Sequence, residues 1–532
     1  MNIAANAAPV DTQLLAQLVQ LVGAEAVLTG DAVLTYSTDV YRSLELPLAV
    51  VKPMTVEQLQ HVVRAATSAG MAVFTRGGGA SYTDGYLPNR HASILVDMSG
   101  LTRIVEINEA DGYVTAEAGL TWAALKSELD QRGLRTPFFG PFSGLAATLG
   151  GSIAQHSIAH GSAAHGISAQ SVISLDVVLA SGQLLRTGSA ARGSAPFLRW
   201  YGPDLTGLFT GDCGALGIKA RVTLPLLKRK PAFAGVSFGF QRLEDMARAM
   251  RAAALERIED ENFAIDAALS RGQIARQEQS STMAVIGRVW STAPSALAGL
   301  RQLLRMGLAG TRHLRAYEYT LHLIVEGIDQ DEVAIKTRRL RTLMQGDAGT
   351  EIANTVPAIV RGMPFAPLFN TLGPQGERWV PLHGVLPHSQ VAPFHHALKE
   401  FFASRAAQMQ QLGVWSGGMY TTVGTSGFLY EIALYWPGAQ TAYHKMVLPA
   451  DFLAKLPGYP HSDATTAYVE QLKLDLIALY EQSGATHFQL GKMYPYAGVL
   501  SAESLQLLRD IKKSLDPQHL LNPGALDLPQ HD

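Results

Sequence analysis

The chain has 532 residues, and its 43 Lys and Arg against 45 Asp and Glu leave a formal net charge of −2, which excludes a protein that binds nucleic acid through a strongly basic surface. Charged residues make up 17% and apolar residues 47%, against about 25% charged residues in an average soluble domain, so we expect a large globular protein with well-buried domains. A single cysteine, Cys213, excludes an intrachain disulfide and a metal site built from cysteines.

The first predicted elements form a strand–helix–strand unit. Apolar residues at helical spacing predict a short helix within residues 12–29. Residues 48–53 are typical of a strand that ends at Pro53, and Thr55 with Gln58 is a capping-box start for a helix to Ala69. A second strand follows at residues 71–75, and such a unit is typical of a parallel crossover connection.

The next stretch contains strands, one helix and one long irregular segment. Residues 136–170 are dense in Gly, Ser, Ala and His without periodicity, which predicts a loop of a length that usually serves function. A hairpin that turns at Ser181-Gly182 and a closing strand before Leu226 follow it. The other predicted elements are strands at residues 93–98, 104–108 and 113–117 and a helix at residues 121–132.

The composition changes near residue 228, where Leu227-Lys-Arg-Lys-Pro231 forms a short basic linker. Beyond it, helices alternate with β-like runs, which predicts an α+β second domain in which helices cover a sheet. The predicted helices are residues 243–258, 295–306 and 331–344, and the predicted strands are residues 233–240, 283–290 and 314–325. A last segment carries a helix at residues 502–515, so we divide the chain into domains at 1–228, 229–480 and 481–532.

Three glycine-rich corners punctuate the first domain. They are Arg76-Gly-Gly-Gly-Ala-Ser-Tyr82, Ala147-Thr-Leu-Gly-Gly-Ser-Ile-Ala154 with its continuation to Gly161 and Gly166, and Gly211-Asp-Cys-Gly-Ala-Leu-Gly217. Turns without Cβ atoms let several backbone N–H groups converge on a diphosphate. The first corner is not the dinucleotide fingerprint, because Tyr82 stands at the last glycine position. Three such corners indicate a long ligand that lies across the domain.

The corners belong to blocks in which the chain resembles the vanillyl-alcohol oxidase and p-cresol methylhydroxylase superfamily, which includes the flavin subunits of glycolate oxidase and D-lactate dehydrogenase. The matching blocks are residues 47–53, 76–82, 148–154, 175–182, 202–218 and 515–524. The resemblance implies an α+β fold with a two-part FAD-binding domain of the vanillyl-alcohol oxidase type, a central α+β cap (substrate) domain, and a final segment that returns to the FAD-binding domain.

The resemblance also implies which residues hold FAD. The first corner would bind the pyrophosphate, the second would line flavin and pyrophosphate, and the third would approach the adenine end. Many family members attach the flavin to a histidine directly after the first glycines, where this chain has Ala80, so we expect no covalent bond there, while attachment through a cap histidine stays open. The implied FAD-binding residues are Arg76, Gly77, Gly78, Gly79, Ala80, Ser81, Tyr82, Pro141, Thr148, Gly150, Gly151, Ser152, Ala154, His156, Gly161, Gly166, Gly214, Gly217, Ile218 and Asn522.

Oxidation of an alcohol by flavin needs a group that accepts the hydroxyl proton, and His, Tyr and Lys serve this role. We predict four catalytic residues: His487, Lys492 and Tyr494 in the final segment, and His383 in Pro381-Leu-His-Gly-Val-Leu-Pro-His388. The alternative is that the first three fasten the last segment to the FAD-binding domain and His383 is a packed polar residue. The 2-hydroxy-acid branch places an acidic residue between two metal-binding histidines; this stretch has none, so we predict no metal.

Other polar residues allow competing interpretations. His156, His160 and His165 stand at a spacing that zinc ligands use, although we favour a flavin contact for His156. Glu431 could bind a substrate amine or guanidinium, and a surface charge is the favoured alternative. Ser237 fits a Gly-x-Ser-x-Gly elbow, which needs a helix directly after the serine, but the apolar run continues through Phe240 and places Ser237 inside a strand.

We therefore predict an FAD-dependent oxidoreductase that transfers hydride from an aromatic or otherwise flat alcohol to flavin N5 and is reoxidised by oxygen or another acceptor. The alternatives are a 2-hydroxy-acid dehydrogenase of the D-lactate or glycolate type, a catalytically silent flavin-binding carrier or assembly protein, and a zinc hydrolase. The resemblance suggests a homodimer. The chain has no apolar run of the roughly 18–20 residues that span a membrane and no signal-like start, so we expect a cytoplasmic protein.

Overall fold

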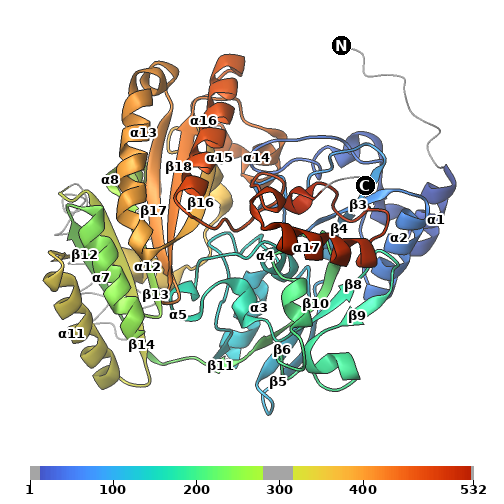
Figure 1. The fold of residues 1–532 in the computed structure, drawn as a ribbon, viewed down its shortest axis with the longest axis horizontal. Coiled ribbons are helices and arrows are strands. Elements are labelled where there is room, and N and C mark those ends of the chain that lie inside the picture. The colour runs from blue at the N-terminus through green and yellow to red at the C-terminus, as the bar shows by residue number, and fades with distance from the viewer. Residues whose placement is uncertain (1–11, 279–315, 529–532) are drawn as a thin grey trace.

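The computed structural model describes residues 12–278 and 316–528, and the predicted helix 295–306 and strand 283–290 lie outside these ranges. The described chain forms two lobes (Figure 1). We call them the two-sheet lobe, which holds the glycine corners and the last helix, and the seven-stranded lobe, which is built on one large antiparallel sheet. Helices and strands both contribute throughout, so the predicted α+β class is confirmed.

The first sheet of the two-sheet lobe is the predicted crossover unit. Strands β2 (Ala49–Val51) and β3 (Ala72–Arg76) both run parallel to β4 (Ser93–Asp97), which lies between them, and β1 (Val27–Leu28) pairs with β2. Helix α2 (Val56–Ser68) connects β2 to β3, and the Thr55 hydroxyl caps it by accepting from Gln58 N. Helix α1 (Thr12–Val22) packs on α2 through Leu14 and Leu18.

The second sheet of this lobe has the strand order β5-β6-β10-β8-β9. The predicted hairpin is confirmed, because β8 and β9 pair antiparallel. The five strands are β5 (Ile104–Asn108), β6 (Tyr113–Glu117), β8 (Ser174–Val178), β9 (Leu184–Arg186) and β10 (Ile218–Pro225). The helices of this part are α3 (Trp122–Gln131), α4 (Leu149–Ala154), α5 (Ser162–His165), α6 (Leu205–Leu208) and α17 (Ala502–Leu515).

Residues 136–170 do not form the structureless loop that composition predicted. The segment contains α4 and α5 and the 3-10 turn Ser168–Ser171, and Thr148 caps α4 by accepting from Gly151 N over 3.3 Å. The sequence gives little sign of α4, because Gly150 and Gly151 have low helical propensity and carry no apolar side chain that would show a helical period. The expectation of an irregular loop was therefore wrong.

The seven-stranded lobe has the strand order β15-β12-β14-β13-β17-β18-β16. Its strands are β12 (Ala232–Phe240), β13 (Glu261–Asp266), β14 (Tyr319–Gly327), β15 (Thr350–Ile352), β16 (Arg378–Pro387), β17 (Trp415–Val423) and β18 (Gly427–Trp436). Its helices are α7 (Leu243–Glu256), α8 (Ala267–Glu278), α11 (Gln330–Gly346), α12 (Thr355–Gly362), α13 (Val391–Leu412), α14 (Ala442–Val447), α15 (Ala450–Leu453) and α16 (Asp463–Gln482). The two-stranded pair of β7 (Leu134–Arg135) and β11 (Leu227–Lys228) lies where the chain enters this lobe.

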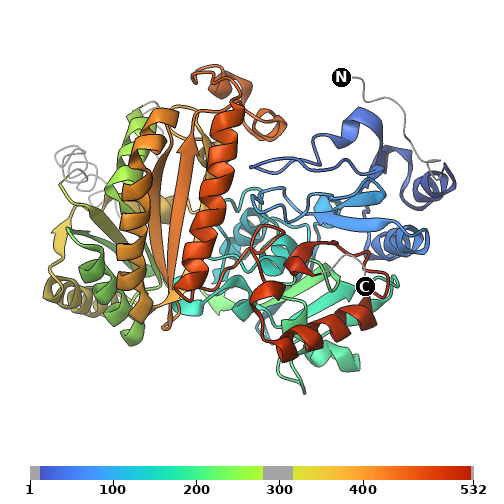
Figure 2. The ribbon, with the colours of Figure 1, turned by 45° about the horizontal axis from the view of Figure 1, so that its top comes forward.

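The large sheet has two unlike faces. On its outer face, side chains such as Leu382, Ile432 and Leu434 pack with Met246, Leu398 and Leu476 of α7, α13 and α16 in one hydrophobic core, as the layer of helices in Figure 2 indicates. Because side chains alternate along a strand, the intervening residues of β16 and β18 point to the inner face. That face contacts the two-sheet lobe, for example between His383 and Tyr82 and between Phe263 and Phe142.

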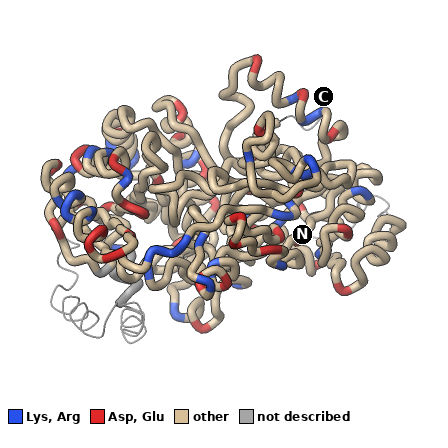
Figure 3. The backbone as a smooth tube through the Cα atoms, turned by 90° about the horizontal axis from the view of Figure 1, so that it is seen from below, with Lys and Arg blue, Asp and Glu red and all other residues tan. Residues whose placement is uncertain are grey.

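The last segment leaves the seven-stranded lobe after α16 and returns to the two-sheet lobe, where α17 lies (Figures 1 and 2). Acidic and basic residues are interspersed along the described part of the chain in Figure 3. Among the described helices, none combines the length and hydropathy that a membrane crossing requires.

Candidate active site

The first glycine corner follows β3 and is pressed against the second. A Cβ on Gly78 would overlap the backbone carbonyl of Ala146, and a Cβ on Gly77 would overlap the Thr148 hydroxyl. Gly79 has φ +70°, a left-handed conformation that glycine adopts without strain. The three glycines therefore let the two corners meet backbone to backbone.

Five residues other than glycine adopt left-handed backbones where the corners meet the final segment: Asp84, His156, Cys213, Gln489 and Asn522. Backbone hydrogen bonds join these segments. Gln489 N donates to the Gln155 carbonyl over 2.8 Å, and Cys213 N donates to the Ala154 carbonyl over 2.9 Å. Each such conformation costs about 1–3 kcal/mol and persists only where the surroundings enforce it, commonly at functional sites. No local sequence signal marks Asp84 or Gln489, so sequence reasoning missed both.

Asn522 and Lys492 connect the final segment to these corners. The Asn522 amide donates to Cys213 O and, over 2.9 Å, to Gly85 O, and its Oδ1 accepts from Lys492 Nζ over 2.7 Å. Lys492 Nζ also donates to Asp84 O over 3.0 Å. Burial lowers the pKa of Lys492 to about 8. The structure therefore places Lys492 among the glycine corners, where it fastens the final segment, and apart from the other three residues predicted as catalytic.

Those three residues, His383, His487 and Tyr494, lie together between the lobes. His383 is on the inner face of β16, and its backbone N–H donates to the Tyr494 hydroxyl over 3.0 Å. His487 Nδ1 lies 2.8 Å from His383 O, and the His487 ring stacks on Tyr494 with 4.2 Å between ring centres. Tyr82 reaches this group from the first corner, with its hydroxyl 3.3 Å from His383 Nε2.

The group is uncharged at neutral pH and has spare polar atoms. Burial, with a smaller effect of His487, lowers the pKa of His383 to about 3, and burial lowers the pKa of His487. Burial also raises the pKa of Tyr82 and of Tyr494 well above the usual value. Among the described residues, His383 Nδ1 and His487 Nε2 are buried and have no hydrogen-bond partner. A neutral imidazole with an unused nitrogen is able to accept a proton from a ligand or donate one to it.

Glu431 lies beside this group. It is the cross-strand partner of His383 in the β16–β18 pair, so both side chains share the inner face. Burial raises the pKa of Glu431 to about 7. The favoured expectation of a surface charge was therefore wrong, because the register of an interior strand turns this side chain toward the two-sheet lobe.

Several predicted FAD-binding residues have packing partners that account for them without a ligand. A Cβ on any of three predicted glycines would overlap a neighbouring side chain: Ala118 at Gly150, Gln170 at Gly166 and Val177 at Gly217. Ser152 Oγ accepts from Trp122 Nε1 over 2.8 Å, so its side chain is engaged inside the lobe. Gly161 caps α5, Ile218 begins β10, Gly214 approaches Thr75, and Pro141 O accepts from Gly144 N.

Other predicted positions keep unused polar atoms where the corners meet. The Arg76 guanidinium lies over the rings of Tyr36 and Tyr86, at 5.3 and 5.5 Å, and its buried Nε has no partner among the described residues. His156 Nε2 is likewise buried without a described partner, and burial lowers the pKa of His156 to about 4. Glycine corners in contact, a buried guanidinium and neutral histidines suit a ligand with a diphosphate and a flat polar ring, so the residues present fit FAD.

The competing sites receive no support. In the described part of the chain no three metal-ligating side chains come together, and His160 instead lies 2.7 Å from Glu261 Oε2 and 2.6 Å from Pro364 O. Ser237 lies inside β12, as the sequence indicated, and no helix follows it directly. Cys213 is buried, and burial raises the pKa of its thiol to about 12, which does not suit a nucleophile.

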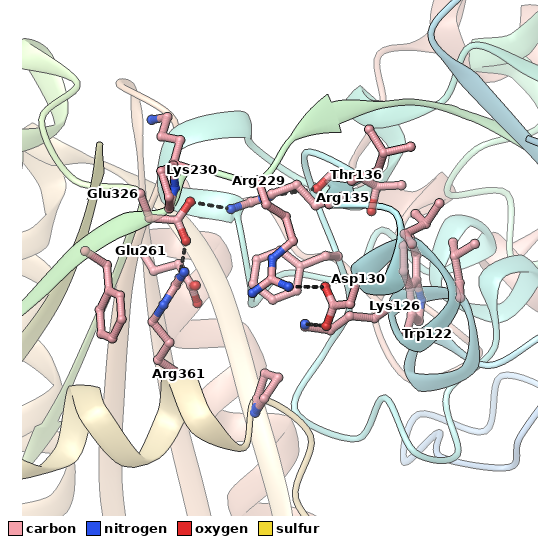
Figure 4. Close-up of a pocket in the computed structure, with 18 of the residues that line it drawn as sticks. Trp122, Lys126, Asp130, Arg135, Thr136, Arg229, Lys230, Glu261, Glu326 and Arg361 are labelled. Atoms are coloured by element: carbon pink, nitrogen blue, oxygen red, sulfur yellow. Dashed lines mark hydrogen bonds and ion pairs between the residues drawn. The ribbon is translucent and has the colours of Figure 1, made fainter. Parts of the chain in front are cut away.

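A cavity of about 480 Å³ lies elsewhere on the boundary between the lobes, between α3, the linker before β12 and α12. Figure 4 shows that several of its charged side chains pair with one another. Arg135 lies 2.9 Å from Glu326, which also pairs with Arg361, and Arg229 lies 3.4 Å from Asp130. None of the predicted site residues lines this cavity. Its ion pairs hold the two lobes together, for example between Arg135 and Glu326.

Comparison with known proteins identifies the class. Residues 47–188 match a sequence family described as FAD binding domain. Over 98% of the chain, the fold is similar to that of p-cresol methylhydroxylase (TM-score 0.73, 17% identity, 98% of that chain) and of alkyldihydroxyacetonephosphate synthase (TM-score 0.69, 14% identity, 86% of that chain). Residues 47–188 are therefore an FAD-binding domain, the chain as a whole has the fold of p-cresol methylhydroxylase, and FAD is the cofactor that the domain match gives.

Curated relatives match part of the chain. The mitochondrial D-lactate dehydrogenase [cytochrome] of Arabidopsis thaliana is 30% identical over 188 residues, which are 35% of this chain and 32% of that protein. The glycolate oxidase subunit GlcD of Escherichia coli is 27% identical over 227 residues, 42% of this chain and 43% of that protein. The matched regions thus span 32% and 43% of the length of these two relatives.

Proposed function

We propose that the protein is an FAD-dependent oxidoreductase that oxidises an alcohol, preferably an aromatic or otherwise flat one, with residues 229–480 acting as the cap over the substrate. The observation that carries the proposal is the contact between Tyr82 of the first glycine corner and His383 of the large sheet. It joins the part of the chain that resembles FAD-binding domains to neutral proton-accepting groups. FAD, when bound, accepts the hydride from the substrate C–H bond.

The protein's own residues supply the proton chemistry in this proposal. As the alcohol loses hydride and becomes a carbonyl compound, its hydroxyl proton passes to the Tyr82–His383 pair. His383 is placed to accept it, because one of its ring nitrogens is unpartnered among the described residues and burial keeps the imidazole neutral. Tyr494 and His487 hold the backbone of His383 in place. Oxygen or another acceptor would then take up the two electrons that the substrate gave as hydride.

Aromatic side chains around this group favour a flat substrate. Trp379 lies 5.5 Å from Tyr82, edge to face, and Phe488 stacks on His383 at 3.9 Å. Such rings offer flat apolar surface to an aromatic alcohol. A 2-hydroxy-acid substrate, as for the D-lactate and glycolate relatives, is the alternative that the sequence matches favour.

The deciding experiment is anaerobic reduction of the FAD-loaded protein by a panel of alcohols, followed by absorbance at the flavin band. We expect vanillyl alcohol or a similar benzylic alcohol to bleach the flavin faster than D-lactate or glycolate does. Faster bleaching by D-lactate or glycolate assigns the hydroxy-acid function instead. A fully loaded preparation that no member of the panel bleaches supports the catalytically silent flavin carrier.

A further inference from the structure

The carboxylate of Glu431 has no hydrogen bond or ion pair among the described residues. Many buried carboxylates of the protein are paired: Glu117 lies 2.8 Å from Arg103, Asp516 2.6 Å from Lys512, and Glu261 2.7 Å from His160. Glu481 also keeps a buried oxygen without a described partner, but it belongs to α16, on the outer face of the large sheet. For Glu431, burial is the only cause that shifts its pKa. A buried carboxylate without a partner is costly to a fold, so its place requires an explanation.

Glu431 lies on the inner sheet face, on β18, next to the edge strand β16. Its cross-strand neighbours are His383 on β16 and Met419 on β17, and its charge acts on the buried hydroxyls of Tyr82 and Tyr494. The side chain is only half-buried by exposed area although the surrounding protein shifts its pKa strongly. A side chain that is deep in the molecule and still accessible is suited to meet a ligand.

Among the described residues, the surroundings of Glu431 are aromatic and hold no cation that shifts its pKa. Tyr82 and Trp379 form an edge-to-face pair beside His383, and His383 is kept neutral by burial. Carboxylate and aromatic faces together are the groups that recognise an organic cation, through an ion pair and through cation–π attraction. A neutral ligand would leave the carboxylate unpaired.

We propose that Glu431 selects a substrate with a cationic nitrogen group, an ammonium or amidinium carried on a flat scaffold. This inference rests on the proposed function, because it assigns the substrate class of the same site. The substrate cation pairs with Glu431 on β18 while its alcohol lies toward the Tyr82–His383 pair.

Benzamidine and benzamide test the site, because they share one flat shape, differ in charge and carry no alcohol to oxidise. Calorimetric titration of the FAD-loaded protein at pH 8 should give benzamidine an affinity at least about tenfold higher than that of benzamide. The Glu431→Gln variant should lose this preference, and Glu431→Asp, which keeps the charge, should retain part of it. Glu351→Gln, a change on an exposed glutamate of β15, should behave as the unmodified protein does.

Equal binding of the two ligands by the unmodified protein overturns the proposal, and so does a preference that survives in Glu431→Gln. FAD content and circular dichroism establish that each variant is folded and loaded. The same pair with an added alcohol, 4-(hydroxymethyl)benzamidine and 4-(hydroxymethyl)benzamide, separates this proposal from the proposed function. Bleaching by the amide without a preference for benzamidine refutes only the cation site. A preference for benzamidine in a protein that no alcohol bleaches supports the cation site and refutes the oxidoreductase.

Discussion

The two lobes form their parts of the candidate site in different ways. In the two-sheet lobe the corners are fixed by backbone: glycines in contact, left-handed residues, and carboxylates paired with cations, such as Asp212 with Lys219, although Arg76 Nε and His156 Nε2 have no partner among the described residues. On the inner face of the large sheet the backbone is regular, and polar side chains are left unpaired, as at His383 Nδ1 and Glu431. The part of the protein that fits FAD is therefore built from backbone conformation, whereas the proposed substrate side is built from side chains on a regular sheet.

The largest effect is expected where conformation is essential. Gly78→Val should abolish FAD binding, because any side chain there collides with the Ala146 carbonyl and forces the first two corners apart. The measurement is flavin absorbance per protein after purification, together with the FAD titration of any apoprotein. Gly458→Val is the matched control, since a Cβ at that glycine meets no atom within 4 Å, and it should bind FAD normally. Normal flavin content in Gly78→Val would contradict the role given to the corner.

The second largest effect is expected for a side chain on the inner face of the large sheet. His383→Leu should keep FAD bound and lower the rate of flavin reduction at saturating alcohol by about 10²–10⁴-fold, which is the range of a lost general base. Stopped-flow absorbance under anaerobic conditions measures this rate. The control is His388→Leu, because His388 lies beyond the end of β16 in a 3-10 turn and contacts Phe428. A rate in His383→Leu within a few-fold of the unmodified protein would return His383 to a packing role.

This difference between the halves also explains what the sequence could predict. Glycine corners, the Thr55 cap and the Ser181-Gly182 turn are local signals, since a few adjacent residues determine the backbone there, and the first sheet with its helices followed from them. The partners of His383 depend instead on register between strands far apart in the sequence, such as β16 and β18. Local reasoning therefore found His383, His487 and Tyr494 as candidates but misjudged Glu431.

A smaller effect, on stability, is expected for the unpaired carboxyl group of Glu431. Because burial raises the pKa of Glu431 from an ordinary value near 4.5 to about 7, the folded protein holds this proton at pH values where the unfolded chain has lost it. The carboxyl therefore costs no stability below about pH 4.5 and destabilises the fold increasingly as the pH rises to about 7, with a constant cost above that.

Glu431→Gln should accordingly raise the stability of the ligand-free protein by about 1–3 kcal/mol at pH 8 and change it little at pH 4.5. Thermal unfolding of both proteins at the two pH values measures the difference. The neighbouring His383, Tyr82, Tyr480 and Tyr494 are present in both proteins, so their titration cancels in the comparison. A variant less stable than the unmodified protein at pH 8 would mean that the carboxylate has a partner, and the contrast between the lobes would be lost.

The smallest effect is expected at a polar pair of the large sheet that lies away from the candidate site. Ser237 Oγ and His322 Nδ1 are 2.9 Å apart and buried, and burial lowers the pKa of His322 to about 3. Ser237→Ala should cost about 1 kcal/mol of stability, because it leaves one buried imidazole nitrogen without its partner, and it should leave flavin reduction unchanged. Thermal unfolding and stopped-flow reduction of the same preparation measure the two quantities. A large loss of turnover would show that the inner face acts as one unit from β12 to β16, whereas an unchanged rate confines the chemistry to the strands that Tyr82 reaches.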